Sequence, residues 1–298
     1  MTELGQRPVV LDIDRSVGPL PGRLVLPLEH WQEAIRFGCS LDTLRRFGRM
    51  LDELLPERYG TVFTGSGDFH HLSWPLIARL QAGKPGRASR PFQVVVLDNH
   101  PDNMRFPFGV HCGSWVRRVA SLPMVSHVHV LGITSADIGV GHAWENHLAP
   151  LLRGRLTYWH IGVDTRWARR LGLAKAFRGF DSPQALVDAF VERQRTQEGP
   201  TYLSIDKDAF APEVARTNWD QGRLQLSHAL ALIDSLRGGL VGSDINGEVS
   251  HYQYKSWWKR RLSAMDEQPA IDPAMLAGWQ AQQHALNLQL LAAIAARG

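Results

Sequence analysis

The sequence predicts an α/β fold: a three-layer α/β/α sandwich around a mostly parallel sheet. Short apolar runs alternate along the chain with longer amphipathic segments, which is typical of parallel strands joined by helices. The run at residues 94–97 is apolar at every position, as expected for a strand that is covered on both faces. Polar residues follow several of these runs directly, at the edge where open α/β sheets bind their ligands.

The expected elements keep this alternating order. Apolar or alternating runs predict strands at residues 8–13, 60–64, 94–97, 127–133, 156–163, 201–205 and 238–248. Helical periodicity predicts helices within 29–54, at 73–80, from 114 onward, and at 177–197, 226–236 and 273–297. In the first helical region Ser40 or Asp42 can cap the second half. In the helix over 177–197 the cap is Asp181 or Ser182, and Pro183 suits the first turn.

The composition is that of a soluble globular protein. Of the 298 residues 44% are hydrophobic and 21% are charged, and we see no repeat or linker, so residues 1–298 are expected to form a single domain. The net charge is +4 and the basic residues are scattered, which argues against nucleic-acid binding. No apolar run is long enough for a membrane span. The two cysteines form no Cys-x-x-Cys pair and no signal segment is evident, so we expect a cytoplasmic protein, with its oligomeric state left open.

One polar cluster follows the strand at 94–97. It places Asp98, His100 and Asp102 at alternate positions directly after the apolar run. Carboxylate and imidazole groups are hard oxygen and nitrogen ligands that suit a divalent metal ion. Asp and Pro are also common in turns after strands, so on its own this cluster fits either a metal site or a polar turn.

Similar clusters follow other expected strands, and in a parallel sheet they would meet at one edge. They are His70 or His71 after a glycine-rich turn, the pair Asp206 and Asp208, and Asp244 or Glu248. Carboxylates crowded at one edge repel each other and raise each other's pKa, which two divalent cations would offset. The combined pattern favours a binuclear metal site. Asp12 and Asp14 also follow a strand, but nothing nearby completes a site, and we interpret them as a polar strand end.

Residues 60–250 resemble the arginase/ureohydrolase superfamily. That family carries Gly-Gly-Asp-His, Asp-Ala-His-x-Asp and Ser-x-Asp-x-Asp in this order. Here residues 65–70 read Gly-Ser-Gly-Asp-Phe-His, residues 98–102 read Asp-Asn-His-Pro-Asp, and residues 204–208 read Ser-Ile-Asp-Lys-Asp. The resemblance implies an α/β/α sandwich with two Mn2+ ions. It implies that the metals are contacted or bridged by Asp98, Asp102 and Asp206, and that their coordination is completed by His70, His100 and Asp208.

The chain departs from the family pattern in two places. Phe69 is inserted before the histidines, so the first ligand is His70 or His71; we favour His70, because residues 70–72 then match the family's His-Ser-Leu. At residues 244–249 the family has Asp-Ile-x-Glu-Val, and Glu248 comes one residue late. Glu248 or Asp244 would bind the substrate guanidinium through a two-pronged hydrogen bond.

The loop at 109–113, Gly-Val-His-Cys-Gly, resembles the family's loop with a proton-shuttling histidine. His111 therefore has two interpretations, a proton carrier to the departing amine or a hydrogen-bonded structural histidine.

The resemblance implies a hydrolase that converts a guanidino group to urea and an amine. Arginine to ornithine is the expected reaction, and the family's substrates include free arginine, agmatine, guanidino acids and arginine within a peptide. The partner is thus a guanidino-containing small molecule or an arginine-containing peptide. Two other functions stay open: a deacetylase-like amide hydrolase with one zinc ion, and a metal-binding scaffold without catalysis.

Overall fold

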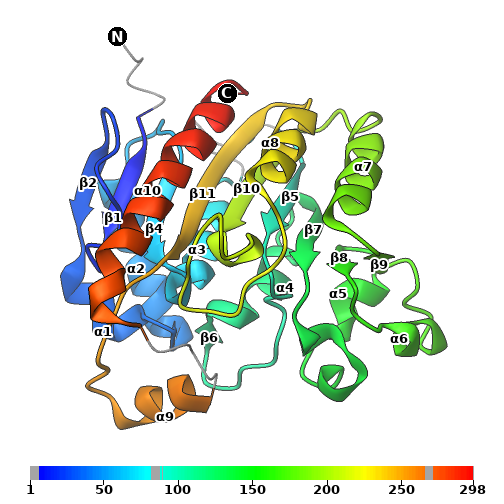
Figure 1. Ribbon diagram of the computed structural model, residues 1–298, viewed down its shortest axis with the longest axis horizontal. Coiled ribbons are helices and arrows are strands. Elements are labelled where there is room, and N and C mark those ends of the chain that lie inside the picture. The colour runs from blue at the N-terminus through cyan, green and yellow to red at the C-terminus, as the bar shows by residue number, and fades with distance from the viewer. Residues whose placement is uncertain (1–6, 82–87, 89, 266–270, 298) are drawn as a thin grey trace.

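The computed structural model describes residues 7–81, 88, 90–265 and 271–297. Within these residues nine strands form one sheet, and every neighbouring pair in it is parallel (Figure 1). In spatial order the strands are β2 (Leu24–Pro27), β1 (Val9–Asp12), β4 (Val62–Ser66), β11 (Leu240–Glu248), β10 (Thr201–Asp206), β5 (Phe92–Leu97), β7 (Val125–Ile133), β8 (Leu156–Ile161) and β9 (Phe177–Phe180). The predicted parallel sheet is confirmed. A separate antiparallel pair joins β3 (Gly38–Cys39) to β6 (Val110–His111).

Helices cover both faces of the sheet, which gives three layers. One face packs against α1 (Gln32–Ile35), α2 (Leu41–Leu54), α3 (Ser73–Ala78), α4 (Val116–Val119), α5 (Leu148–Leu152) and α6 (Arg166–Arg170). The other packs against α7 (Pro183–Gln194), α8 (Leu226–Ser235) and α10 (Pro273–Ala295), which lie in front of the sheet in Figure 1. Strand β5 contributes to both cores, with Val94 and Val96 on one side and Val95 and Leu97 on the other. This alternation is why its sequence is apolar at consecutive positions.

The remaining elements are short or lie at the periphery. Helix α9 (Trp257–Met265) follows β11 through residues 249–256. Short 3-10 helices occur at η2 (Glu29–Trp31), η3 (Gly67–Leu72), η4 (Cys112–Ser114), η5 (Ala136–Ile138), η6 (Val140–His142) and η7 (Lys207–Ala209). Among the helices of the described residues, none has both the length and the apolar character needed to cross a membrane.

The structure corrects two element boundaries. The helical region expected over 29–54 is interrupted at Phe37, whose φ of +66° is incompatible with a right-handed helix, and Ser40 then caps α2 by accepting a hydrogen bond from the Thr43 amide. The helix expected over 177–197 begins only at Pro183, after its Ser182 cap. The four residues of β9 before it pair with β8 as an edge strand instead. Strand β2 was not predicted.

Candidate metal centre

The metal ligands expected from the sequence meet at the carboxyl edge of the sheet. His70 lies in η3, immediately after β4, and its side chain is buried. Asp98 and Asp102 follow β5, while Asp206 ends β10. Strand β5 pairs with β10, and β10 with β11, which in turn pairs with β4, so these strand ends are close in space. The parallel direction of the strands therefore brings together segments that are distant in sequence.

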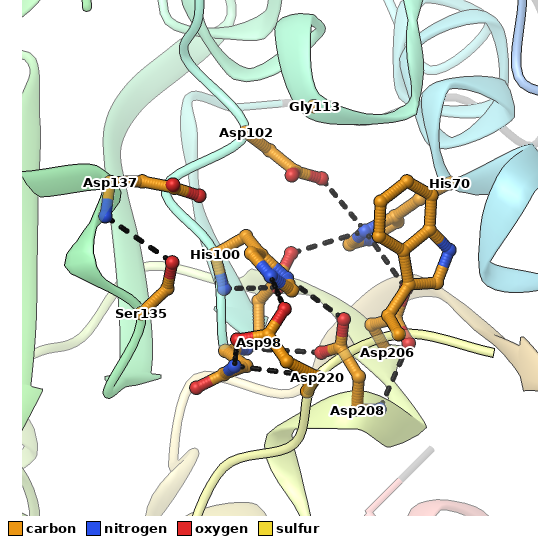
Figure 2. A network of polar contacts seen from close by, with 12 residues as sticks. His70, Asp98, His100, Asp102, Gly113, Ser135, Asp137, Asp206, Asp208 and Asp220 are labelled. Carbon is orange, nitrogen blue, oxygen red and sulfur yellow. Dashed lines mark hydrogen bonds and ion pairs between the residues drawn. The ribbon is translucent and has the colours of Figure 1, made fainter. Parts of the chain in front are cut away.

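The first ligand group surrounds the His70 imidazole (Figure 2). His70 Nδ1 lies 2.9 Å from Asp102 Oδ2, 3.1 Å from Asp98 Oδ2 and 3.4 Å from Asp206 Oδ2. The potential ligand atoms of His70, Asp98 and Asp102 all lie within 4.8 Å of one another. Such an arrangement can hold one metal ion.

The second ligand group surrounds His100. His100 Nδ1 lies 2.9 Å from Asp208 Oδ2 and 3.6 Å from Asp98 Oδ1. Asp98, His100 and Asp208 again have their ligand atoms within 4.8 Å of one another. Asp98 belongs to both groups, so its two carboxylate oxygens can serve two neighbouring ions.

Hydrogen bonds from outside the groups hold the ligands in place. Trp115 Nε1 donates to Asp102 Oδ2 at 2.6 Å, and the backbone N–H of Asn99 donates to Asp208 Oδ1 at 3.0 Å. His70 Nε2 lies 3.0 Å from Ser204 Oγ, so Nδ1 is left to face the carboxylates. Fixing the second nitrogen of a ligand histidine in this way orients the ring toward a metal.

Carboxylates crowd this edge, and their pKa values reflect it. Burial and the charge of Asp98 raise the pKa of both Asp102 and Asp208 to about 7. Burial and the charge of Asp208 raise the pKa of Asp206 well above its usual value. Although burial opposes it, the charge of Asp102 holds the pKa of His70 well above 6.5. Buried acids that resist ionisation beside one another are suited to a site that gains positive charge, and the oxygen and nitrogen donors fit divalent cations.

Asp220 is a site residue that sequence reasoning missed. Its Oδ1 lies 2.7 Å from His100 Nε2, and its Oδ2 accepts a hydrogen bond from Asn99 Nδ2 at 3.0 Å. A carboxylate on the outer nitrogen of a ligand histidine fixes the ring and raises its basicity. The signal was weak, because Asp220 lies in the loop after β10 with no motif around it.

The ligand groups lie in a cavity of about 470 Å³. Besides the ligands and Asp220, its lining includes two carboxylates that the sequence did not suggest, Asp137 and Glu145. His142 Nδ1 lies 3.2 Å from Glu145 Oε1. In Figure 2 the Asp137 carboxylate points toward the ligand groups, and no described residue donates a hydrogen bond to it. The lining residues include neither arginine nor lysine.

His111 also lines the cavity. Its ring stacks on Phe37 and meets the edge of Phe106, with centroids 5.9 Å and 4.5 Å apart. Its Nδ1 accepts a hydrogen bond from the Gly113 amide, so the ring hydrogen of the neutral imidazole is on Nε2. Burial lowers the pKa of His111 to about 4. The histidine is thus neutral at physiological pH and in contact with the cavity.

The structure places three other sequence candidates outside the cavity lining. Glu248 is buried and paired with Lys207 Nζ at 2.5 Å, and Asn287 Nδ2 donates to the same oxygen at 2.6 Å. Asp244 accepts hydrogen bonds from hydroxyl groups of neighbouring elements, among them that of Tyr202 at 2.6 Å. His71 is fully buried outside both ligand groups, and burial lowers its pKa to about 3.

Asp14 has no place in the metal centre either. It lies 3.6 Å from the buried Arg36 guanidinium and accepts a hydrogen bond from the Ser250 hydroxyl. Arg36 also pairs with Asp68 at 2.7 Å, two residues before His70. These interactions stabilise the turn that contains His70.

Comparisons with known proteins show what the chain resembles in sequence and in fold. A protein of Thermotoga maritima, described as uncharacterised, is 25% identical over 214 residues, which cover 72% of this chain and 67% of that one. Proclavaminate amidino hydrolase from Streptomyces clavuligerus superposes with a TM-score of 0.53 at 16% identity, over 97% of this chain and 92% of that one. Formimidoylglutamase from Bacillus subtilis superposes with a TM-score of 0.55 at 12% identity, over 98% of this chain and 87% of that one. A Trypanosoma cruzi formiminoglutamase with Mn2+ superposes with a TM-score of 0.52 at 13% identity, over 99% of this chain and 94% of that one.

At these identities the superpositions show a shared fold. The sequence itself shows the family. The model of the arginase family matches residues 33–252, which is most of the chain. That range contains both ligand groups and the cavity that surrounds them. The chain therefore belongs to the arginase family.

Proposed function

We propose that this protein is a binuclear, manganese-dependent ureohydrolase that converts a guanidino group to urea and an amine. The observation that carries the proposal is the pair of ligand groups sharing Asp98 on the wall of one cavity. His70, Asp98, Asp102 and Asp206 would hold one ion, and Asp98, His100 and Asp208 the other. When bound, two such cations supply Lewis-acid activation of a water molecule.

The chain's own residues would orient the substrate. His111 is neutral and carries its hydrogen on Nε2, so Nε2–H can donate a hydrogen bond to the departing nitrogen; to act as a proton carrier the ring must first take up a proton. No described residue donates a hydrogen bond to the Asp137 carboxylate, so this carboxylate can accept hydrogen bonds from a guanidinium. In this proposal Asp137 takes the guanidinium-binding role that the sequence had suggested for Glu248 or Asp244.

The charge of the cavity bears on the substrate. Beyond the ligands its wall adds Asp137, Glu145 and Asp220, without an arginine or lysine to receive a carboxylate. A free α-carboxylate near this wall would face like charges. We therefore favour an arginine side chain within a peptide, or another guanidino compound without a free carboxylate, over free arginine.

The loops at the cavity are consistent with a larger substrate. The side chains of Phe108 and Trp144 are 68% and 71% exposed. In sequence, Trp144 lies between the lining residues His142 and Glu145. An isolated β-bridge between Met104 and Asn146 joins the loop of Trp144 to the loop that leads to Phe108. Exposed aromatic side chains beside a cavity provide contact area for the neighbours of a peptidyl arginine.

The first experiment measures metal per chain in the wild type and in the double variant Asp102→Ala/Asp208→Ala. We expect two manganese ions in the wild type and a substantial loss in the variant. Asp164→Ala is the matched control, because Asp164 also follows a strand but pairs with Arg166 at the surface. One zinc ion untouched by the double variant would instead favour a deacetylase-like enzyme.

The second experiment measures urea release from free arginine, agmatine, a guanidino acid and an arginine peptide blocked at both ends. We expect kcat/KM to be about tenfold or more higher for the blocked peptide or agmatine than for arginine. Asp137→Asn should raise KM for the preferred substrate. Two bound metals without urea release from any of these compounds would favour a scaffold role, and a preference for free arginine would contradict the charge argument.

A further inference from the structure

A second cavity, of about 210 Å³, lies away from the metal centre. It is formed by β7, β8, β9 and the last turn of α7, at the end of the sheet shown with these labels in Figure 1. His127 is near the start of β7, and Arg178 is near the start of β9. The metal ligands follow the opposite ends of their strands. We call this cavity the basic pocket; it shares no lining residue with the metal-site cavity.

The lining of the basic pocket carries positive charge without a compensating acid. Lys175, Arg178 and Arg193 line it, and neither aspartate nor glutamate is among the lining residues described. Burial and the charge of Arg178 lower the pKa of Arg193, as expected for cations that face each other. Arg193 is in the last turn of α7, where the helix dipole offsets part of its charge. Lys175 precedes β9 and Arg178 is in it, so neither side chain lies at the carboxyl end of a helix whose dipole could offset its charge.

The wall of the basic pocket also contains a buried donor without a partner. His129 is 1% exposed, and its Nδ1 accepts a hydrogen bond from Trp159 Nε1 at 3.2 Å. The neutral ring therefore carries its hydrogen on Nε2, and that atom has no hydrogen-bond partner in the described structure. A buried N–H group without an acceptor is costly, so an acceptor atom from a ligand in this cavity would be stabilising.

Arg178 is arranged for recognition of a planar or tetrahedral anion. Its guanidinium carbon lies 4.6 Å from the centroid of the Trp159 ring. Stacking uses the face of the guanidinium and leaves the N–H groups in its plane free to bind oxygen atoms. Trp159 thus positions Arg178 and at the same time orients His129.

We propose that the basic pocket binds a phosphate group, either free or as a small phosphate monoester. Three positive side chains match the charge of about −1.5 to −2 that a phosphate group carries at neutral pH better than the single charge of a carboxylate. The guanidinium groups of Arg178 and Arg193 and the ammonium group of Lys175 bind the oxygens, and His129 Nε2–H donates one further hydrogen bond. The site does not depend on the proposed ureohydrolase activity.

The test is calorimetric titration of the metal-loaded protein at constant ionic strength, in a buffer without phosphate. Inorganic phosphate and glycerol 3-phosphate are titrated separately. We expect saturable binding in the wild type, and Arg193→Gln should weaken it about tenfold or more because a charge-assisted pair is lost. Lys175→Gln should weaken it as well. The matched control is Arg195→Gln, because Arg195 is exposed at the same helix end, pairs with Glu192 and does not line the pocket.

Each outcome of the titration has a defined meaning. Tighter binding of glycerol 3-phosphate identifies an esterified ligand, and tighter binding of inorganic phosphate identifies the free ion; both support the site. Absence of saturable binding of either compound overturns the proposal. Equal affinity in the wild type and Arg193→Gln also overturns it, because phosphate is then bound elsewhere, for instance at the metals. Circular dichroism verifies that the variants, which change exposed side chains, remain folded.

Discussion

The ion pair between Lys207 and Glu248 provides the sharpest test of the site geometry. Both side chains are almost completely buried, at 0% and 2% exposed, and their charged atoms are 2.5 Å apart. After the substitution Lys207→Met, the Glu248 carboxylate keeps the hydrogen bond from Asn287 Nδ2 but loses its cation. Removing one partner of a buried pair typically costs about 3–5 kcal/mol, because the other charge remains uncompensated.

The double variant Lys207→Met/Glu248→Gln removes both charges at once. A buried pair can often be replaced by neutral groups at little cost, so we expect the double variant to be more stable than Lys207→Met alone. Urea denaturation followed by circular dichroism, with chelator present to remove metal effects, measures both. With m-values of about 1–3 kcal/mol/M, a cost of about 3–5 kcal/mol should shift the midpoint of the single variant by about 1 M or more.

Glu192→Gln is the matched control for this series. Glu192 pairs with Arg195 at the surface, with 67% and 62% of the side chains exposed, and such pairs contribute about 1 kcal/mol or less. If Lys207→Met is as stable as this control, the buried pair does not have the energetic role that the structure implies. If Glu248→Gln raises KM strongly and leaves stability unchanged, Glu248 contacts the substrate and our assignment of its place is refuted.

Further predictions concern the ligands and their surroundings. His70→Asn should reduce bound metal while His71→Asn should leave it unchanged, since His71 lies outside both ligand groups; metal analysis of the two variants separates the alternatives. Trp115→Phe removes the hydrogen bond to Asp102 and should weaken metal affinity about 10- to 100-fold, measured by competition with a chelator. The pKa of Asp102 is raised from 3.8 to about 7, so between these values Asp102 binds more protons in the folded metal-free protein than in the unfolded chain. The lowered pKa values of His71 and His111 act in the opposite direction, so the test compares the wild type with Asp102→Asn. The stability of the wild type relative to this variant should fall from pH 4 to pH 7 in thermal melts with chelator, and a relative rise would contradict the pKa direction of Asp102.

The clustering of the candidate ligands could be predicted because residues that are close in sequence lie together at a strand end. Asp98, His100 and Asp102 follow β5 within a few residues, so a parallel sheet is enough to place them at its edge. Asp137, Glu145 and Asp220 could not be found in this way. They lie on loops whose paths are set by tertiary contacts, such as the hydrogen bonds from Asn99 to Asp220 and the bridge between Met104 and Asn146. Local patterns do not encode such contacts.

Strand β9 was missed for a related reason. The four residues from Phe177 to Phe180 are too short a run to show a period, and a helix start follows them directly at Ser182 and Pro183. As an edge strand, β9 is defined by its pairing with β8 rather than by its own sequence. The basic pocket depends on this strand, because Arg178 is part of it. Its lining residues also come from distant segments of the chain, which no local motif connects.

Glu248 shows how one additional residue changes the chemistry that a motif can perform. The pairing of β11 with β4 shifts around Asn246, and Gly247 adopts a φ of +84°, so the strand bulges where the family's glutamate is expected. A Cβ at Gly247 would lie 2.4 Å from Asp206 Oδ1, so only glycine fits beside this carboxylate. Beyond the bulge the Glu248 side chain contacts Asn287 of α10 and Lys207, instead of the cavity. The motif keeps its carboxylate, but that carboxylate is paired with Lys207 in the core, and our proposal therefore assigns recognition of a guanidinium to acids on the cavity loops.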